Sequence, residues 1–167
     1  MTILDIPVIS RIRRNHGLEH ATITILSRRM PSIHVAGYSF PGGFLLLGEV
    51  PTEQVREVVM QALLRMNNGE RRLAVHPNCG TNLLTAGFLA GVLGWLGMAG
   101  AKTRKEKAER LPAVIALSML GILAAQPLGP MIQERITTSG DPQGLTVVEV
   151  FPVKIGRFTL HRVVTQG

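Results

Sequence analysis

Two long stretches without a charged residue constrain this chain more than any other feature of its sequence. Residues 79–101 and residues 111–133 each run for 23 positions without Asp, Glu, Lys or Arg. A helix of about 20 apolar residues crosses the hydrocarbon core of a bilayer. Soluble helices of this length normally carry a polar face, which neither stretch shows. The sequence therefore predicts an integral membrane protein with two transmembrane helices.

The two stretches also divide the chain into regions. The sequence predicts an N-terminal α+β segment over residues 1–80 and a transmembrane helical hairpin over residues 81–133, with a basic loop at 102–110. Residues 134–167 are expected to form a C-terminal β segment. Because a two-span hairpin returns the chain to its starting side, both terminal segments are expected to build one small head domain. The predicted fold class is an α+β membrane protein.

Two helices are predicted in the N-terminal segment. Residues 16–29 form the first, with Asn15 as its N-cap. The second begins with Thr52 as its cap and ends at Gly69, a residue typical of helix C-termini. Its apolar residues follow the helical period, which predicts that one face of this helix is buried.

Strands are predicted in both terminal segments. Residues 33–40 and 44–50 flank Pro41-Gly42-Gly43, a turn signal that predicts a hairpin. Residues 145–150 and 157–164 are rich in β-forming residues and predict a second pair of strands.

Small residues in the two predicted spans favour close packing of helix backbones. We expect this packing within the hairpin or within a homo-oligomer formed through the glycine-rich first span. Pro127 and Pro130 are expected to kink or end the second span. The small residues are Gly87, Gly91, Gly94, Gly97 and Gly100 in the first span and Ala113, Ala116, Gly121, Ala124 and Ala125 in the second.

The net charge of +7 points to a lipid surface and not to nucleic acid, because aromatic residues are only 4% and the basic residues flank the apolar stretches. The expected partners are therefore the lipid bilayer and a membrane-protein complex or a second copy of the chain.

We expect a multi-pass protein of the cytoplasmic membrane. The basic loop at 102–110 favours a cytoplasmic loop by the positive-inside rule. An arginine-rich N-terminal segment without the pattern of a secretory signal favours cytoplasmic termini instead, and we follow this second argument.

The sequence His16-Gly17-Leu18-Glu19-His20 carries the clearest chemistry. Histidines four residues apart lie on one face of a helix, where both imidazoles reach one metal ion. Glu19 falls on the same side and is expected to act as a catalytic base on a metal-bound water. The arrangement H-x-x-E-H resembles that of inverted zincin metallopeptidases, which implies zinc as the metal and peptide hydrolysis as the activity.

A catalytic zinc ion takes three protein ligands, so a third ligand is needed. His76, in His76-Pro77-Asn78-Cys79-Gly80, is the first choice, and Cys79, His34 and Glu70 are weaker candidates. Two structural alternatives stay open: a hydrogen-bonded polar network without metal at the first motif, and a turn that caps the first span at the second. His161, alone on a predicted strand, is expected at the surface.

A second resemblance covers most of the chain. The segment from Asn15 to Thr22, followed by residues 74–82 and two spans, resembles an uncharacterised bacterial family of small two-span membrane proteins, known as a domain of unknown function. This resemblance implies the architecture and implies that the two histidine segments belong to one site. It implies no activity.

Two functional hypotheses follow. The first is a membrane-bound zinc metalloprotein, with metal at His16, His20 and His76 and with Glu19 as the base of a peptidase acting near the membrane surface. The alternative is a non-catalytic accessory subunit of a larger respiratory or photosynthetic membrane complex.

Overall fold

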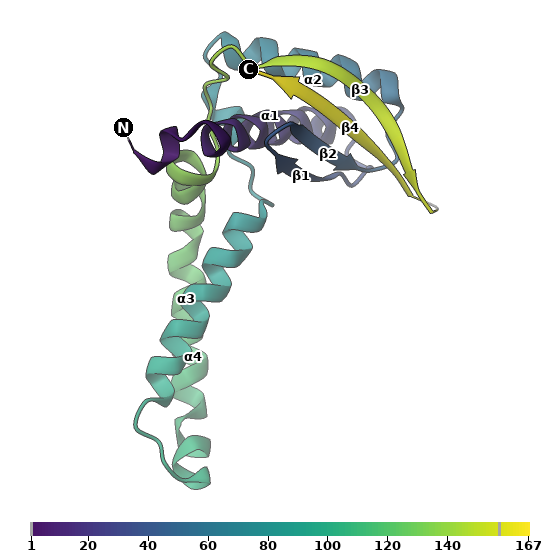
Figure 1. The fold of residues 1–167 in the computed structure, drawn as a ribbon. Helices are drawn as coiled ribbons and strands as arrows, with labels where there is room; N and C mark the ends of the chain where they lie inside the picture. Colours follow the sequence, from purple (N-terminus) through teal and green to yellow (C-terminus); the bar gives the residue numbers. More distant parts are fainter. Residues whose placement is uncertain (1, 157) are drawn as a thin grey trace. The chain divides into compact units, whose positions relative to one another are not determined.

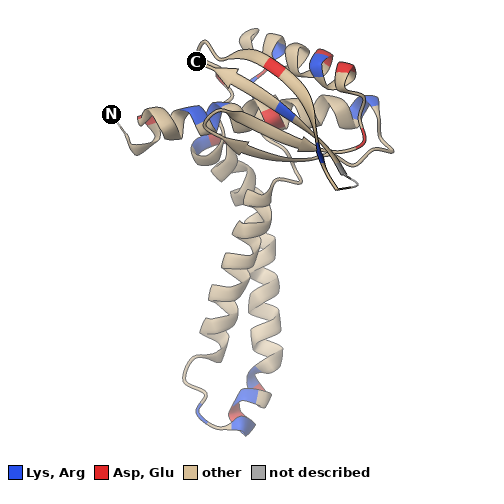
Figure 2. Cartoon of the chain, turned by 45° about the vertical axis from the view of Figure 1, so that its right-hand side comes forward, with Lys and Arg blue, Asp and Glu red and all other residues tan. Residues whose placement is uncertain are grey.

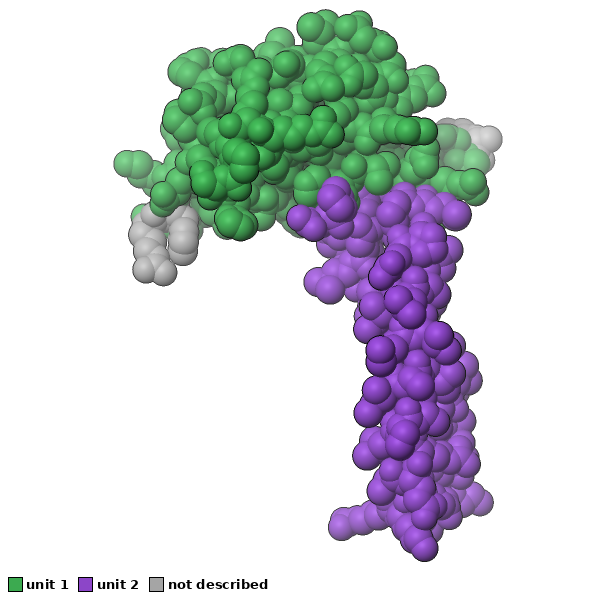
Figure 3. Space-filling model, turned by 180° about the vertical axis from the view of Figure 1, so that it is seen from behind, with its two compact units in different colours: residues 1–76, 134–167 green, residues 77–133 purple. Residues whose placement is uncertain are grey.

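The computed structural model describes residues 2–156 and 158–167. The chain divides into two compact units, one made of Met1–His76 together with Glu134–Gly167 and the other of Pro77–Gln133 (Figure 3). The first unit is α+β, and the second is a pair of antiparallel helices joined by a short connector (Figure 1).

A single four-stranded antiparallel sheet joins the two ends of the chain in the α+β unit. Phe44 pairs with Val163, so the N-terminal hairpin is hydrogen-bonded to the C-terminal one (Figure 1). The N-terminal and C-terminal segments are therefore joined by backbone hydrogen bonds. The strands, in their order across the sheet, are β1 (Ala36–Phe40), β2 (Gly43–Leu47), β4 (Phe158–Gln166) and β3 (Thr146–Ile155).

One face of this sheet forms the core. Phe44 and Leu46 of β2 and Val163 of β4 are buried, because alternate strand residues point to the same face. The helices α1 (Pro7–Arg29) and α2 (Thr52–Asn67) cover this face (Figure 1). They contribute apolar side chains such as Leu18 and Val58, which are fully buried.

The helix α1 begins nine residues earlier than predicted, at Pro7 instead of residue 16. Asn15 is therefore not an N-cap but lies inside the helix and is fully buried. Its amide donates to the Phe40 and Pro41 carbonyls, and its side-chain oxygen accepts from the Thr165 hydroxyl. Asn15 was therefore wrongly predicted as a cap. Its amide can be buried because hydrogen bonds to both hairpins satisfy it inside the core.

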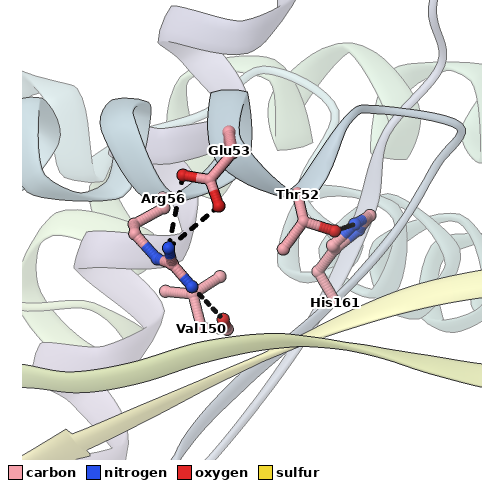
Figure 4. Close-up of polar contacts among 5 residues, drawn as sticks. All are labelled: Thr52, Glu53, Arg56, Val150 and His161. Carbon is pink, nitrogen blue, oxygen red and sulfur yellow. Dashed lines mark hydrogen bonds and ion pairs between the residues drawn. The ribbon is translucent and has the colours of Figure 1, made fainter.

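The start of α2 is tied to the sheet by polar contacts (Figure 4). Thr52 makes no side-chain cap and instead hydrogen-bonds to His161 Nε2 at 3.2 Å. Arg56 pairs with Glu53 and donates to the Val150 carbonyl at 3.1 Å.

His161 is only 1% exposed, so its predicted surface position was wrong: it shares the inward face of β4 with Val163. Burial lowers the pKa of its imidazole.

The second unit consists of α3 (Gly80–Met98) and α4 (Arg104–Ile132). The predicted loop at 102–110 is shorter than expected, because Thr103 caps α4 and exchanges hydrogen bonds with Glu106 in a capping box. Pro127 and Pro130 lie inside α4, which ends only two residues after Pro130. A π-helical turn covers Gln133–Thr137.

Small residues bring α3 and α4 into close contact. A Cβ atom at Gly121 would lie 2.7 Å from the Ala90 backbone nitrogen, and Ser118 donates to the Ala90 carbonyl at 3.2 Å. Gly87 and Gly91 have the spacing of a GxxxG pair, and apart from the backbone of their own helix no heavy atom of the described chain lies within 4 Å of their Cβ positions. Packing within the hairpin therefore uses other glycines than this pair.

Both helices of the second unit are long and apolar enough to cross a membrane. By length and composition, Gly80–Met98 and Arg104–Thr137 qualify. Charged residues of this unit gather at the connector and the first turns of α4 (Figure 2).

We predict that Gly121→Val destabilises the hairpin whereas Gly91→Val does not. A side chain at position 121 meets the backbone of α3, which cannot move aside as a flexible side chain can, and overpacking of this kind costs about 1–3 kcal/mol. The substitution at Gly91 is chemically identical but enters open space, so it controls for helix propensity. Thermal unfolding midpoints of both variants in detergent measure the difference, and equal midpoints would contradict this packing.

Candidate metal centre

The helix α1 brings the three polar residues of the first motif into a largely buried position. The rings of His16 and His20 have their centres 4.3 Å apart, as expected for residues one helical turn apart. His20 is 2% exposed and Glu19 is 4% exposed. The predicted pairing of the two imidazoles on one helix face is therefore present in the structure.

Each of these imidazoles is oriented by a backbone carbonyl. Nδ1 of His16 donates to the Thr137 carbonyl at 2.9 Å, and Nδ1 of His20 donates to the Ala74 carbonyl at 2.7 Å. A carbonyl oxygen only accepts hydrogen bonds, so both Nδ1 atoms carry the proton. In the neutral ring the lone pair is then on Nε2. Both rings therefore have the tautomer and the outer hydrogen bond that are characteristic of metal-binding histidines.

The segment that follows α4 is held tightly against α1. A Cβ atom at Gly17 would overlap the Ser139 carbonyl oxygen, so only glycine permits this approach. Ser139 donates its backbone N–H to the Arg13 carbonyl at 2.9 Å. The Arg13 guanidinium in turn donates to three carbonyls, those of Arg135, Ile136 and Thr138. These contacts fix the Thr137 carbonyl that orients His16.

His76 lies beside this pair. It follows the short 3₁₀ helix η2 (Arg71–Ala74), and its ring centre is 5.8 Å from that of His20. Two imidazoles bound to one zinc ion have ring centres roughly 5 Å apart, because each Zn–N bond is about 2.0–2.1 Å. The spacing of His20 and His76 is therefore close to that of a shared metal.

Glu19 is anchored by the first strand. Its carboxylate accepts a hydrogen bond from the Ser39 hydroxyl and lies against Gly37, where a Cβ atom would overlap it. The strand β1 thus fixes the position of this buried carboxylate. Gly37 and Ser39 were not predicted as site residues. A glycine inside a predicted strand is a recognisable signal of close approach by another group.

Two of the weaker ligand candidates, His34 and Glu70, have other surroundings. His34 is exposed and precedes β1. Glu70 forms a salt bridge with Arg65, and this hydrogen-bonded partner lowers the pKa of the Glu70 carboxyl. Cys79 belongs to the second unit, where its sulfur accepts from the Thr81 backbone N–H at 3.4 Å and caps α3.

Comparison with known proteins places the chain in a family. A family model described as a domain of unknown function, DUF6391, matches residues 11–150. The chain belongs to the DUF6391 family. The resemblance to an uncharacterised bacterial family is thereby confirmed. The DUF6391 match includes His16, Glu19, His20 and His76 and both helices of the second unit.

An uncharacterised protein of Picosynechococcus sp. is similar to this DUF6391 chain. It is 35% identical over 153 residues, which cover 83% of this chain and 71% of that protein. No solved structure matches the chain.

Proposed function

We propose that this protein is a membrane-bound zinc metalloprotein in which His16, His20 and His76 hold the metal and Glu19 acts as the base of a peptidase. One observation carries the proposal: the Nδ1 atoms of His16 and His20 both donate to backbone carbonyls. This outer hydrogen bond fixes the ring and raises the basicity of Nε2 toward a metal.

Several features favour a metal centre over a structural polar network. The two ring centres lie 4.3 Å apart, and His20 is buried while His16 is partly buried, so their polar atoms are costly to leave without partners. A third imidazole lies 5.8 Å from the second. Three histidines with one position open to water or substrate is a typical ligand set of catalytic zinc.

The chemistry proposed for the site is hydrolysis. Bound zinc supplies Lewis acidity toward water and a carbonyl group. The Glu19 carboxylate would take the proton from the attacking water and pass it to the leaving amine. The hydroxyl of Ser39, donating to Oε2, orients this carboxylate. The substrate class proposed is a peptide near the membrane surface.

The proposed location is the cytoplasmic membrane, with the second unit as a two-span hairpin. Large apolar side chains of α3 point outward from the hairpin: Leu83, Leu84 and Trp95 are at least 70% exposed. The same is true to a lesser degree of α4, where Ile115 and Met119 are more than half exposed. Exposed apolar surface of this extent is expected to be covered by lipid. Both termini are proposed to be cytoplasmic.

The alternative function, a non-catalytic accessory subunit of a larger membrane complex, has its own supporting observation. Gly87 and Gly91 form a GxxxG pair on α3 with open space beside them in the described chain. Such a surface suits close contact with a helix of another protein or of a second copy.

We predict that purified full-length protein contains about one zinc ion per chain and that His16→Ala, His20→Ala and His76→Ala each lose it, because a three-ligand site cannot spare an imidazole. Glu19→Gln is expected to retain the zinc but to lower hydrolysis of labelled casein at least about a hundredfold, because its role is proton transfer. Metal analysis by mass spectrometry measures the first effect.

His34→Ala is the matched control, because His34 is exposed and outside the cluster. Loss of zinc from Glu19→Gln would make Glu19 a ligand and contradict its assigned role. Zinc retained by His76→Ala but lost by Cys79→Ser would transfer the third position to Cys79. A native protein without stoichiometric metal would favour the accessory-subunit function.

We predict that the protein stays in the membrane fraction during alkaline carbonate extraction and dissolves only in detergent. The exposed apolar surface of α3 and α4 would otherwise have to be hydrated. Quantitative recovery in the soluble fraction without detergent is the result that would rule out membrane insertion.

A further inference from the structure

A cavity of about 650 Å³ in the α+β unit is lined by three arginines. Arg13 comes from α1, and the consecutive residues Arg71 and Arg72 come from η2. The wall contributed by the segment after α4 carries two carboxylates, Glu134 and Asp141. Three cations against two anions leave this cavity with a positive balance.

The three guanidinium groups are engaged to different degrees. Arg13 uses Nε and Nη2 for carbonyls of the segment 135–138, so it is held in place with Nη1 remaining. Arg71 lies 3.6 Å from Asp141, and both side chains are well exposed, at 71% and 46%, so solvent weakens this pair. Arg72 makes no side-chain hydrogen bond or ion pair with any residue that the structure describes. The cavity therefore has donors for an added anion.

The chemistry of these donors favours a phosphate group. A guanidinium presents paired N–H donors that match two oxygens of a phosphate, and its charge strengthens both hydrogen bonds. The two neighbouring arginines on η2 offer such paired donors, and Arg13 on α1 adds the N–H groups of its Nη1 atom. The volume is sufficient for a phosphate with a small polar substituent.

The place of the cavity in the chain indicates which phosphate is available. Its walls are residues 71–75 and 134–141, which directly precede and follow the second unit at Pro77–Gln133. On the proposed insertion of that unit into the membrane, on which this step rests, both segments lie within a few residues of the bilayer. That depth is the level of phospholipid head groups, where anionic lipids attract Arg and Lys.

We propose that Arg71 and Arg72, supported by Arg13, bind a phosphate group, and that its source is the head group of an anionic phospholipid. The site is separate from the three histidines in its chemistry and needs no metal. It would fix the α+β unit to the lipid surface.

Native mass spectrometry of the full-length protein in detergent tests this proposal. The probes are dihexanoyl phosphatidylglycerol, dihexanoyl phosphatidylcholine and inorganic phosphate. We expect phosphatidylglycerol to bind best and the double variant Arg71→Gln/Arg72→Gln to bind it roughly tenfold more weakly. Arg28→Gln/Arg29→Gln, a pair at the exposed end of α1, removes the same charge and should leave binding unchanged.

Inorganic phosphate that binds as tightly as the lipid would support the phosphate site and assign it to a soluble ligand. Equal weakening of phosphatidylglycerol binding in both double variants would indicate a general effect of charge and would overturn the proposal. Unchanged phosphatidylglycerol binding by Arg71→Gln/Arg72→Gln would also overturn it. Because the assay is carried out in detergent, it does not depend on insertion of the hairpin. Carbonate extraction tests membrane insertion of the hairpin separately. A failure of phosphate binding can therefore be distinguished from a failure of membrane insertion.

Discussion

The α+β unit depends on hydrogen bonds that polar side chains of α1 donate to backbone carbonyls at the ends of two short helical turns, η2 and the π-helical turn at Gln133–Thr137. The last carbonyls of a helix have no partner within the helix and need other donors when they are buried. Arg13, His16 and His20 supply these donors to residues 135–138 and to Ala74. The same bonds therefore hold the chain together where it leaves and re-enters the unit and orient the two imidazoles. One set of hydrogen bonds therefore both stabilises the fold of the α+β unit and positions the candidate metal ligands.

This sharing explains why a polar motif lies inside a small core. Burial of His20, Glu19 and Asn15 carries a desolvation cost that apolar residues would avoid. The cost is offset in part because each group has a partner: the Ala74 carbonyl for His20, the Ser39 hydroxyl for Glu19 and the Thr165 hydroxyl for Asn15. A polar network satisfied in this way fixes side-chain geometry, which the proposed metal site requires. The family match covers the whole arrangement without assigning it an activity.

The sequence predicted elements whose signals are local and missed those set by tertiary contacts. The turn at residues 41–43 and the two C-terminal strands were predicted from neighbouring residues, and the start of α2 was predicted to within one residue, although its N-cap is Pro51 and not Thr52. The early start of α1 was missed, although Pro7 at the first helical position is itself a start signal. The burial of His161 depends on strand alternation within a paired sheet, and the carbonyl partners of His16 and His20 lie more than 50 residues away. Such long-range contacts leave no pattern in a single sequence.

The most direct test of the central claim is zinc K-edge X-ray absorption spectroscopy on the purified full-length protein. The proposed site predicts three imidazole nitrogens at about 2.0–2.1 Å with the multiple-scattering signature of histidine rings and no sulfur. A spectrum with fewer than three imidazoles, or with a sulfur scatterer at about 2.3 Å, would contradict the assignment of His16, His20 and His76 as the ligands.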